Sequence, residues 1–421
     1  MSSYERSSRR ESYGRERRSA PRRASDSYDL ERRSSSRQVE RRRMRFSLLS
    51  IGRGLDVPFI LLILVLLAVG IIMMFSASYP TAYYQIGDSY YYLKRQLLFA
   101  VIGLVIMIVV SYVDYHYYHR FALFILGLSY FALVLVLVLP AQNGVHRWVG
   151  IGSFGIQASE ISKFAIILFL AHWGSRYYDK MDTFKYGILP AAAVFASTSL
   201  LLLLEPHYSC IVIVFILTVV MMFVSGIKLK WLIIGGVVVL GLVLLLWVTG
   251  MLTYAMQRLE GWGQALTTTR DDGELWDTTW QTRNSLYAIG SGGVFGLGLG
   301  QSRQKYLYLP EPQNDFIFAI VCEELGLVGA VIILLIFALL VWRGVIISLR
   351  ARDRFGKLLG IGLISHIGLQ VILNILVITD WLPNTGISLP FFSYGGSSLL
   401  TLMFEMGVIL SVSRTSNIEK T

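Results

Sequence analysis

The stretch Tyr-Leu-Pro-Glu-Pro-Gln-Asn-Asp-Phe-Ile-Phe-Ala-Ile-Val-Cys-Glu-Glu-Leu-Gly, residues 308–326, passes from a polar loop into an apolar helix. Asp315 closes the polar part and opens the apolar part. A charge at the boundary of a membrane helix is costly unless it has a partner or a function. We therefore predict that Asp315 belongs to a functional site facing a water-filled cavity.

The composition of the chain indicates a polytopic membrane protein. Of its 421 residues, 54% are hydrophobic and 15% are charged, and the mean hydropathy is +0.58, which excludes an ordinary soluble domain. The prediction is an all-α integral membrane fold with about ten transmembrane helices, each needing roughly 17–25 apolar residues. The stretches are 57–76, 97–113, 121–139, 161–174, 186–204, 210–225, 231–252, 315–342, 358–379 and 396–412. Two of them, 161–174 and 210–225, are short, so the number could differ by one pair.

The first 53 residues form a separate basic segment, with 16 Arg against seven acidic residues in a chain of net charge +11. Because this segment runs directly into the first apolar stretch, it indicates a cytoplasmic anchor attracted to anionic lipid rather than a nucleic-acid-binding arm. Its richness in Ser, Arg and Glu predicts disorder. The domain prediction is a disordered tail at 1–53, a membrane domain at 54–413 and a cytoplasmic C-terminal tail at 414–421.

Basic residues indicate which loops are cytoplasmic. Arg and Lys are concentrated in the short loops 114–120, 175–185, 226–230 and 343–357, as the positive-inside rule requires of cytoplasmic loops. Ten crossings then place both termini in the cytoplasm and residues 253–314 outside, as a large loop between the seventh and eighth helices. Such a long loop is usually functional. We expect no cleavable signal peptide, because the first apolar run starts far from Met1 and is too long.

A second outer segment, residues 145–163, places charges at the start of a helix. Arg147 lies in a short loop, and Glu160 and Lys163 share one helix face by their i, i+3 spacing. Two interpretations remain open. Glu160 and Lys163 form an internal ion pair that lowers the cost of entering the membrane, or Arg147 and Lys163 bind a lipid pyrophosphate, because guanidinium and ammonium groups match phosphate oxygens.

Two further outer segments contain clustered glycines. Residues 289–300 are rich in glycine and invite comparison with phosphate-binding loops, but they do not reproduce the Gly-x-Gly-x-x-Gly spacing and no hydrophobic strand precedes them, so we predict a flexible, closely packed surface hairpin. In residues 380–398, Pro383 and Pro390 prevent a regular helix. Small residues at 395–398 then begin the last helix and permit close approach of a backbone or a ligand, so this segment is either a re-entrant packing turn or a ligand contact.

Several motifs, in this order, resemble the SEDS family of membrane glycosyltransferases, the FtsW, RodA and SpoVE proteins. They are Asp-Val-Pro at 56–58, Ser-Ala-Ser at 76–78, Tyr-Leu-Lys-Arg-Gln at 92–96, Gln-Ala-Ser-Glu at 157–160, Leu-Pro-Glu-Pro-Gln-Asn-Asp-Phe-Ile-Phe-Ala at 309–319 and Leu-Pro-Phe-Phe-Ser-Tyr-Gly-Gly-Ser-Ser at 389–398. The resemblance covers residues 56 to about 412 and is closer to the FtsW and SpoVE branch. The chain departs from many relatives at Asn314, at Ala158 and at 206–210, where a carboxylate that they carry is missing.

The resemblance implies inverting glycosyl transfer between lipid II molecules at the outer face of the membrane during cell division. Asp315 matches the essential Asp of the family and is the candidate general base. Candidates for binding the departing pyrophosphate are Lys94, Arg95, Arg147 and Lys163. The remaining candidate substrate-binding residues are Glu160, Glu311, Ser393, Gly395, Gly396 and Ser397.

The resemblance also implies a location and partners. We expect the cytoplasmic membrane of a bacterium, a class B penicillin-binding protein, other divisome proteins and membrane lipids as partners, no nucleic acid, a divalent cation (Mg²⁺ or Mn²⁺) and no organic cofactor. The alternatives are a lipid II flippase and a non-catalytic divisome scaffold. A flippase favours charges near the membrane midplane and two related halves, whereas we find no internal repeat and expect the charges to cluster at the outer rim.

Overall fold

The computed structural model describes residues 54–140, 147–151, 154–250, 259 and 261–415. The predicted disordered tail at 1–53 and most of the predicted C-terminal tail lie outside these residues. The α-helices of the described residues are α2 (Val57–Ile86), α3 (Tyr91–Tyr112), α4 (His116–Val138), α5 (Ala158–Arg176), α6 (Leu189–Leu204), α7 (Tyr208–Val224), α8 (Leu229–Val248), α10 (Glu274–Gly292), α11 (Ile317–Leu349), α12 (Arg354–Ile378) and α13 (Gly396–Thr415). A two-stranded antiparallel sheet, β1 (Trp148–Ile151) and β2 (Phe154–Gln157), precedes α5.

Each of the ten predicted apolar stretches overlaps a helix of the described residues, so the all-α membrane fold is confirmed. Within the described residues, seven helices are long and apolar enough to cross a membrane: α2, α3, α4, α6 with the turn before it, α11, α12 and α13. Helices α7 and α8 are shorter apolar helices. Helix α5 has 19 residues and contains both Glu160 and Lys163. The two stretches that the sequence left in doubt are therefore both helical.

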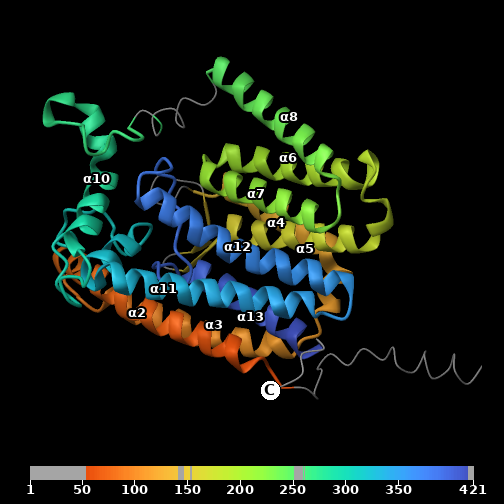
Figure 1. Cartoon of the computed structure of the whole chain (residues 1–421), viewed down its shortest axis with the longest axis horizontal. Helices are drawn as coiled ribbons and strands as arrows, with labels where there is room; N and C mark the ends of the chain where they lie inside the picture. The colour runs from red at the N-terminus through yellow and green to blue at the C-terminus, as the bar shows by residue number, and fades with distance from the viewer. Residues whose placement is uncertain (1–53, 141–146, 152–153, 251–258, 260, 416–421) are drawn as a thin grey trace, which may run out of the picture. The chain divides into compact units, whose positions relative to one another are not determined.

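The centre of the bundle is formed by α5, α12 and α13. Most residues of α5 are buried, as are 61% of the apolar window of α12 and 72% of that of α13, against 28% for α3 and α4. Figure 1 shows α11 and α12 side by side and α8 at the edge of the bundle, where it contacts α7. Polar residues on the central helices are thus enclosed by protein rather than by lipid.

The predicted large loop at 253–314 contains a helix, α10, and the predicted hairpin at 289–300 is wrong. Helix α10 continues to Gly292, and the following backbone pairs with a bend in α11: Leu297 N donates to Glu323 O at 2.9 Å and Leu327 N donates to Gly293 O at 3.0 Å. The bend is at Gly326, where φ is +68°. The glycines permit this close approach, because a Cβ at Gly296 would lie 2.2 Å from Glu324 O.

Candidate active site

Asp315 borders two adjoining cavities. The first, here called the Asp315 cavity, has an empty volume of about 770 Å³, and the second, here called the loop cavity, has about 760 Å³. Both are lined by Arg147, Ser209, Asp315 and Gly386. The remaining lining of the Asp315 cavity is Trp148, Gln157, Glu160, Lys163, His207, Cys210, Ile213, Asn314, Gln370, Ile387, Ser388, Tyr394, Gly395 and Ser398. The loop cavity adds Pro206, Tyr208, Leu259, Pro383, Asn384 and Thr385.

Hydrogen bonds from α12 and from the segment at 380–395 hold Asp315 in place. The side-chain amide of Asn374 donates to Asp315 O and to Ile387 O, each at 2.7 Å. Tyr394 N donates to Gln313 O at 2.8 Å, so the segment folds back on the turn that precedes α11. Gly386 lies beside the carboxylate, since a Cβ there would be 3.0 Å from Asp315 Oδ2. The backbone of Asp315 is therefore fixed while its side chain faces both cavities.

Glu160 and Lys163 form the predicted pair and both line the Asp315 cavity. Lys163 Nζ lies 2.8 Å from Glu160 Oε1, and the two side chains are 3% and 10% exposed. Both lie near the start of α5, which buries their stems among the central helices. The internal ion pair of the first interpretation is thus present in the structure. The same contact places an ammonium group at the cavity wall, as the second interpretation requires.

Arg147, the residue before β1, reaches the cavity and holds the turn between α6 and α7. Its Nη2 donates to Pro206 O at 2.6 Å. The neighbouring Glu205 is fully buried, and neither of its carboxylate oxygens has a hydrogen-bond partner within the described residues. Burial raises the pKa of Glu205 to about 8, although the nearby Arg147 acts in the opposite direction. Glu205 was not predicted from the sequence, although its place at the end of an apolar helix mirrors that of Asp315 at the start of one.

The other two predicted pyrophosphate ligands do not line the Asp315 cavity or the loop cavity. Lys94 is exposed and pairs with Asp88, with Nζ 2.9 Å from Oδ2. The guanidinium of Arg95 lies 4.4 Å from the ring centroid of Tyr91 and interacts electrostatically with Tyr394 in the cavity wall. The structure thus brings Arg147 and Lys163 together at the Asp315 cavity, whereas neither Lys94 nor Arg95 lines it.

The predicted residues of the outer segments have different positions. Gly395 lines the Asp315 cavity. Ser393 Oγ donates to Asn314 O at 2.8 Å, and Glu311 accepts from the Asn314 side chain at 2.7 Å; both therefore support the turn before Asp315 rather than line its cavity. Gly396 packs against Phe99. Ser397 is buried, and its Oγ lacks a hydrogen-bond partner within the described residues.

A buried charged cluster outside the cavities was also missed. The cluster, here called the loop clamp, consists of Ser76, Ser302, Lys305, Glu323 and Glu324. Lys305 Nζ lies 2.9 Å from Glu324 Oε1 and 3.1 Å from Ser76 Oγ, and these two charged side chains are 2% and 0% exposed. Glu323 accepts from the backbone N of Arg303 at 2.9 Å. Two adjacent acidic residues inside an apolar helix were a signal that such partners exist.

The cavity residues do not form a metal cage. No group of three or more His, Cys, Asp or Glu side chains within the described residues is placed to hold a metal ion. The Asp315 cavity has two carboxylates, Asp315 and Glu160, and Glu160 already bonds Lys163. Since Mg²⁺ is usually held by one or two carboxylates together with substrate phosphates, a divalent cation here needs phosphate oxygens from a ligand.

Comparisons with known proteins place the chain in a family. The family model for FtsW, RodA and SpoVE, described as a cell cycle protein, matches residues 57–418. Stage V sporulation protein E of Bacillus subtilis is 42% identical over 364 residues, which cover 86% of this chain and 97% of that protein. A probable peptidoglycan glycosyltransferase FtsW of Trichlorobacter lovleyi is 35% identical, with 85% of this chain and 93% of that protein covered.

Solved structures share the fold. The rod shape determining protein RodA of Thermus thermophilus matches with a TM-score of 0.62 at 24% identity, over 87% of this chain and 99% of that one. A chain of a peptidoglycan synthase complex, described as coordinating polymerization and crosslinking, matches with a TM-score of 0.67 at 24% identity, over 86% of this chain and 98% of that one. At this identity the likeness concerns the arrangement of the helices.

Proposed function

Because this chain belongs to the family of the FtsW, RodA and SpoVE proteins, we propose that it is a peptidoglycan glycosyltransferase that polymerises lipid II. One observation carries the proposal: Asp315, Lys163 and Arg147 meet at a single cavity. Glycosyl transfer from a polyprenyl pyrophosphate needs a base for the attacking hydroxyl and positive groups for the departing anion. The cavity supplies both from separate elements of the fold.

In the proposed reaction, the Asp315 carboxylate accepts the proton of the acceptor 4-hydroxyl while that oxygen attacks the anomeric carbon of the donor. The bond from the anomeric carbon to the pyrophosphate oxygen breaks, and the polyprenyl pyrophosphate leaves with the electron pair, so the configuration inverts. Lys163 and Arg147 stabilise the departing charge. A pyrophosphate is already a stable anion, so no protein acid is required.

The two cavities suggest how donor and acceptor are arranged. Lys163 lines the Asp315 cavity but not the loop cavity, and Arg147 lines both. We assign the donor pyrophosphate to the Asp315 cavity, where both cations are available, and the acceptor sugar to the loop cavity. Asp315 borders both cavities and then lies beside the attacking hydroxyl, within hydrogen-bonding reach of its proton, while the hydroxyl oxygen faces the anomeric carbon directly.

We further propose that this site faces the outside of the cytoplasmic membrane and that both termini are cytoplasmic. Glu160 and Asp315 lie at the starts of α5 and α11. The opposite ends of these helices lead into the basic segments 175–185 and 343–357, which the positive-inside rule places in the cytoplasm. The bundle is a multi-pass membrane protein, and this charge asymmetry supports its orientation.

A class B penicillin-binding protein, other divisome proteins and membrane lipids are the proposed partners. The structural similarity to a chain of a peptidoglycan synthase complex supports the transpeptidase partner. Mg²⁺ or Mn²⁺ is proposed as a cation that binds mainly through the pyrophosphate oxygens of the substrate. Removal of divalent cations by EDTA is then expected to slow polymerisation without unfolding the protein, which a thermal unfolding curve checks.

Purified protein given lipid II distinguishes this function from its two alternatives. Glycan strands on a gel, absent when the lipid II is omitted, support the glycosyltransferase. Transfer of labelled lipid II across a vesicle membrane without any polymer identifies a flippase. Binding of lipid II with neither polymer nor transfer identifies a scaffold. Asp277→Asn, which changes an exposed carboxylate in α10, is the matched control and should polymerise like the wild type.

A further inference from the structure

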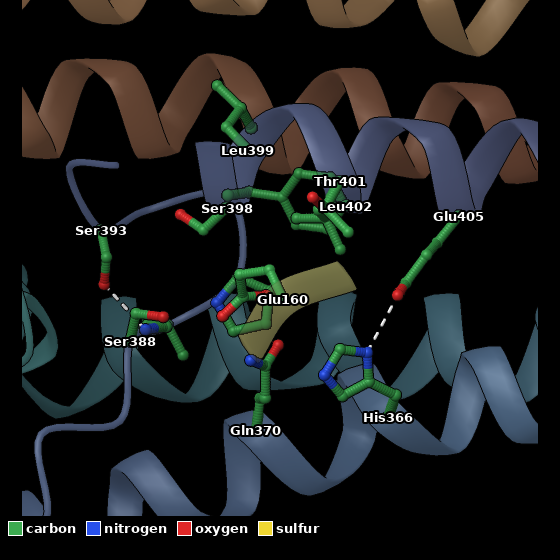
Figure 2. A pocket seen from close by; sticks show the side chains of 13 residues that line it. Glu160, His366, Gln370, Ser388, Ser393, Ser398, Leu399, Thr401, Leu402 and Glu405 are labelled. Atoms are coloured by element: carbon green, nitrogen blue, oxygen red, sulfur yellow. Dashed lines mark hydrogen bonds and ion pairs between the residues drawn. The ribbon is translucent and has the colours of Figure 1, made fainter. Parts of the chain in front are cut away.

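A narrower pocket adjoins the Asp315 cavity, and the proposed reaction does not assign it a ligand. This pocket, here called the His366 pocket, lies between α12, α13 and the segment at 388–393. Four polar residues line both spaces: Glu160, Gln370, Ser388 and Ser398. In Figure 2, the Gln370 side chain extends from α12 toward Glu160. The Asp315 cavity and the His366 pocket therefore meet at polar side chains.

The residues that line only the His366 pocket include five apolar ones and one hydrogen-bonded pair. The apolar residues are Leu389, Pro390, Phe391, Leu399 and Leu402. His366 Nδ1 lies 3.1 Å from Glu405 Oε2, and Glu405 also interacts electrostatically with Lys163. Glu405 is nine residues from the start of α13, about 13 Å along the helix, so the expectation that the charged residues cluster at the outer rim is wrong for this residue. Because protein groups already engage the charges here, the pocket suits a neutral ligand group, which enters without the cost of burying a further charge.

Gln370 is the polar side chain that the protein leaves available at the boundary of the two spaces. It is 7% exposed, and within the described residues its side-chain amide makes no hydrogen bond. Buried amides normally have a partner. The neighbouring groups are engaged, since Glu160 bonds Lys163 at 2.8 Å and Ser398 Oγ donates to Gly395 O at 3.1 Å. Gln370 therefore keeps both a donor and an acceptor for a ligand that enters from the Asp315 cavity.

Gln370 also lies close to the candidate base. It is four residues before Asn374 in α12, and the Asn374 side chain donates to Asp315 O at 2.7 Å. Residues four apart share a helix face and are separated by about 6 Å along the axis. Gln370 thus lies about one helical turn from the residue that holds Asp315 in place. A ligand group that reaches Gln370 belongs to the part of the substrate that reacts.

We propose that the His366 pocket binds the 2-acetamido group of the donor sugar, and that Gln370 recognises its amide. The inference rests on the proposed function for the identity of the ligand. The acetamido nitrogen is bonded to the sugar carbon next to the anomeric carbon, so a donor that presents its anomeric carbon near Asp315 brings this group to the same wall. Gln370 then bonds the N–H or the carbonyl, and the apolar residues beyond it contact the methyl group. Gln370 does not line the loop cavity, to which the acceptor is assigned, so this recognition concerns the donor.

The test removes the acetamido group from the ligand and the amide from the protein, separately and together. The probes are a polyprenyl pyrophosphate that carries one N-acetylated sugar and its 2-hydroxy analogue, and their dissociation constants are measured with the full-length protein in detergent. The wild type should bind the N-acetylated probe more tightly. Gln370→Leu should bind that probe about two- to twelvefold more weakly, as expected for the loss of one neutral hydrogen bond, and should bind the 2-hydroxy probe like the wild type.

Gln264→Leu is the matched control, because this exposed glutamine lies outside the pocket and both cavities, and it should keep the wild-type preference. A structural role of Gln370 predicts a different result. Gln370→Leu would then weaken the binding of both probes equally, and this outcome overturns the inference.

The wild type alone provides a test that does not depend on the folding of a variant. An N-butanoyl analogue should bind more weakly than the N-acetylated probe, because the His366 pocket is narrow, and equal binding of the two overturns the assignment to this pocket. Equal binding of the N-acetylated and 2-hydroxy probes overturns the recognition of the acetamido group but leaves the proposed function standing, since the pyrophosphate is still bound. If the wild type binds none of the probes, the proposed function falls as well.

Discussion

Charged side chains are buried in two regions, and the regions differ in what surrounds them. In the loop clamp, the Lys305 ammonium contacts Glu324, Ser76 and Gly300 O. None of the loop clamp residues lines the Asp315 cavity or the loop cavity. Around Asp315, by contrast, Glu160 and Lys163 line open volume.

The difference distinguishes a structural use of buried charge from a functional one. A cluster whose donors and acceptors are all used holds chain segments together, and here it fixes residues 300–305 against α2 and α11. A charge that faces a cavity keeps capacity for a ligand, at some cost in stability. Substitutions in the loop clamp should therefore change stability first, whereas substitutions around Asp315 should change activity first.

The largest effect is expected from Asp315→Asn. The amide is nearly isosteric and keeps the packing at the start of α11, but it does not accept a proton at neutral pH. Loss of a general base typically lowers the rate by about 10² to 10⁴, so polymer should vanish in an endpoint gel assay while lipid II binding and thermal stability remain. Asp315→Glu should also be slow, because the added methylene displaces the carboxylate. If folded Asp315→Asn polymerises near the wild-type rate, Asp315 is not the base, and the buried charges around it have no functional use that distinguishes them from the loop clamp.

Substitution in the loop clamp should mainly cost stability. Lys305→Met or Glu324→Gln leaves a buried group without its partner, which typically costs about 3–5 kcal/mol. The double substitution should lower the free energy of unfolding by less than the sum of the two single substitutions. Thermal unfolding of the three variants measures this difference. Lys94→Met is the control, since its pair with Asp88 is exposed, and it should not shift the unfolding temperature. Equal effects of Lys305→Met and Lys94→Met would contradict the role assigned to the clamp.

The pair of Glu160 and Lys163 should combine both behaviours. Each single substitution, Glu160→Gln or Lys163→Met, should lower stability less than those in the loop clamp, because water in the cavity solvates the remaining charge. Polymerisation should be lost in both. The double variant should recover stability without recovering activity, as parallel unfolding and gel assays will show. If both single variants fold and polymerise normally, the pair has no part in the site.

The pH dependence of stability should reveal Glu205. Burial holds the pKa of its carboxyl at about 8 in the folded protein, above the ordinary value of 4.5. The folded state therefore binds more protons than the unfolded state between these values, so stability falls as pH rises from about 4.5 to about 8. In Glu205→Gln this part of the decline should be absent. If the free energy of unfolding falls equally with pH in the wild type and in Glu205→Gln across this range, Glu205 is not a buried, unpaired carboxyl.

The smallest effect is expected from deletion of residues 1–40, which lie outside the described residues. In the proposed orientation this segment is cytoplasmic and does not reach a reaction at the outer face, and Arg41, Arg42, Arg43 and Arg45 remain as a basic anchor. The rate of polymerisation by the purified, correctly inserted protein should be unchanged. A loss of activity in detergent would show that the tail acts on the cavity.

The helices could be predicted because a membrane span is visible locally in the sequence as a long apolar stretch. The position of Asp315 at a cavity could be predicted because this residue interrupts one such stretch at its boundary. Pairings between distant residues left no such local record. Ser76 and Glu324 are 248 residues apart in the sequence, and Arg147 and Pro206 are 59 apart. Lys94 was chosen by resemblance, but its position at the start of α3 directs it to Asp88. Glu405 was overlooked although a single carboxylate within a predicted span is itself a signal.

The most direct test of the account is a structure of the full-length Asp315→Asn protein with lipid II bound. We expect the donor pyrophosphate against Lys163 and Arg147, and the acceptor 4-hydroxyl about 2.6–3.2 Å from the side chain at position 315. A hydroxyl that lies instead against Glu205 or Glu311, with position 315 beyond hydrogen-bonding reach and no bridging water, would contradict it.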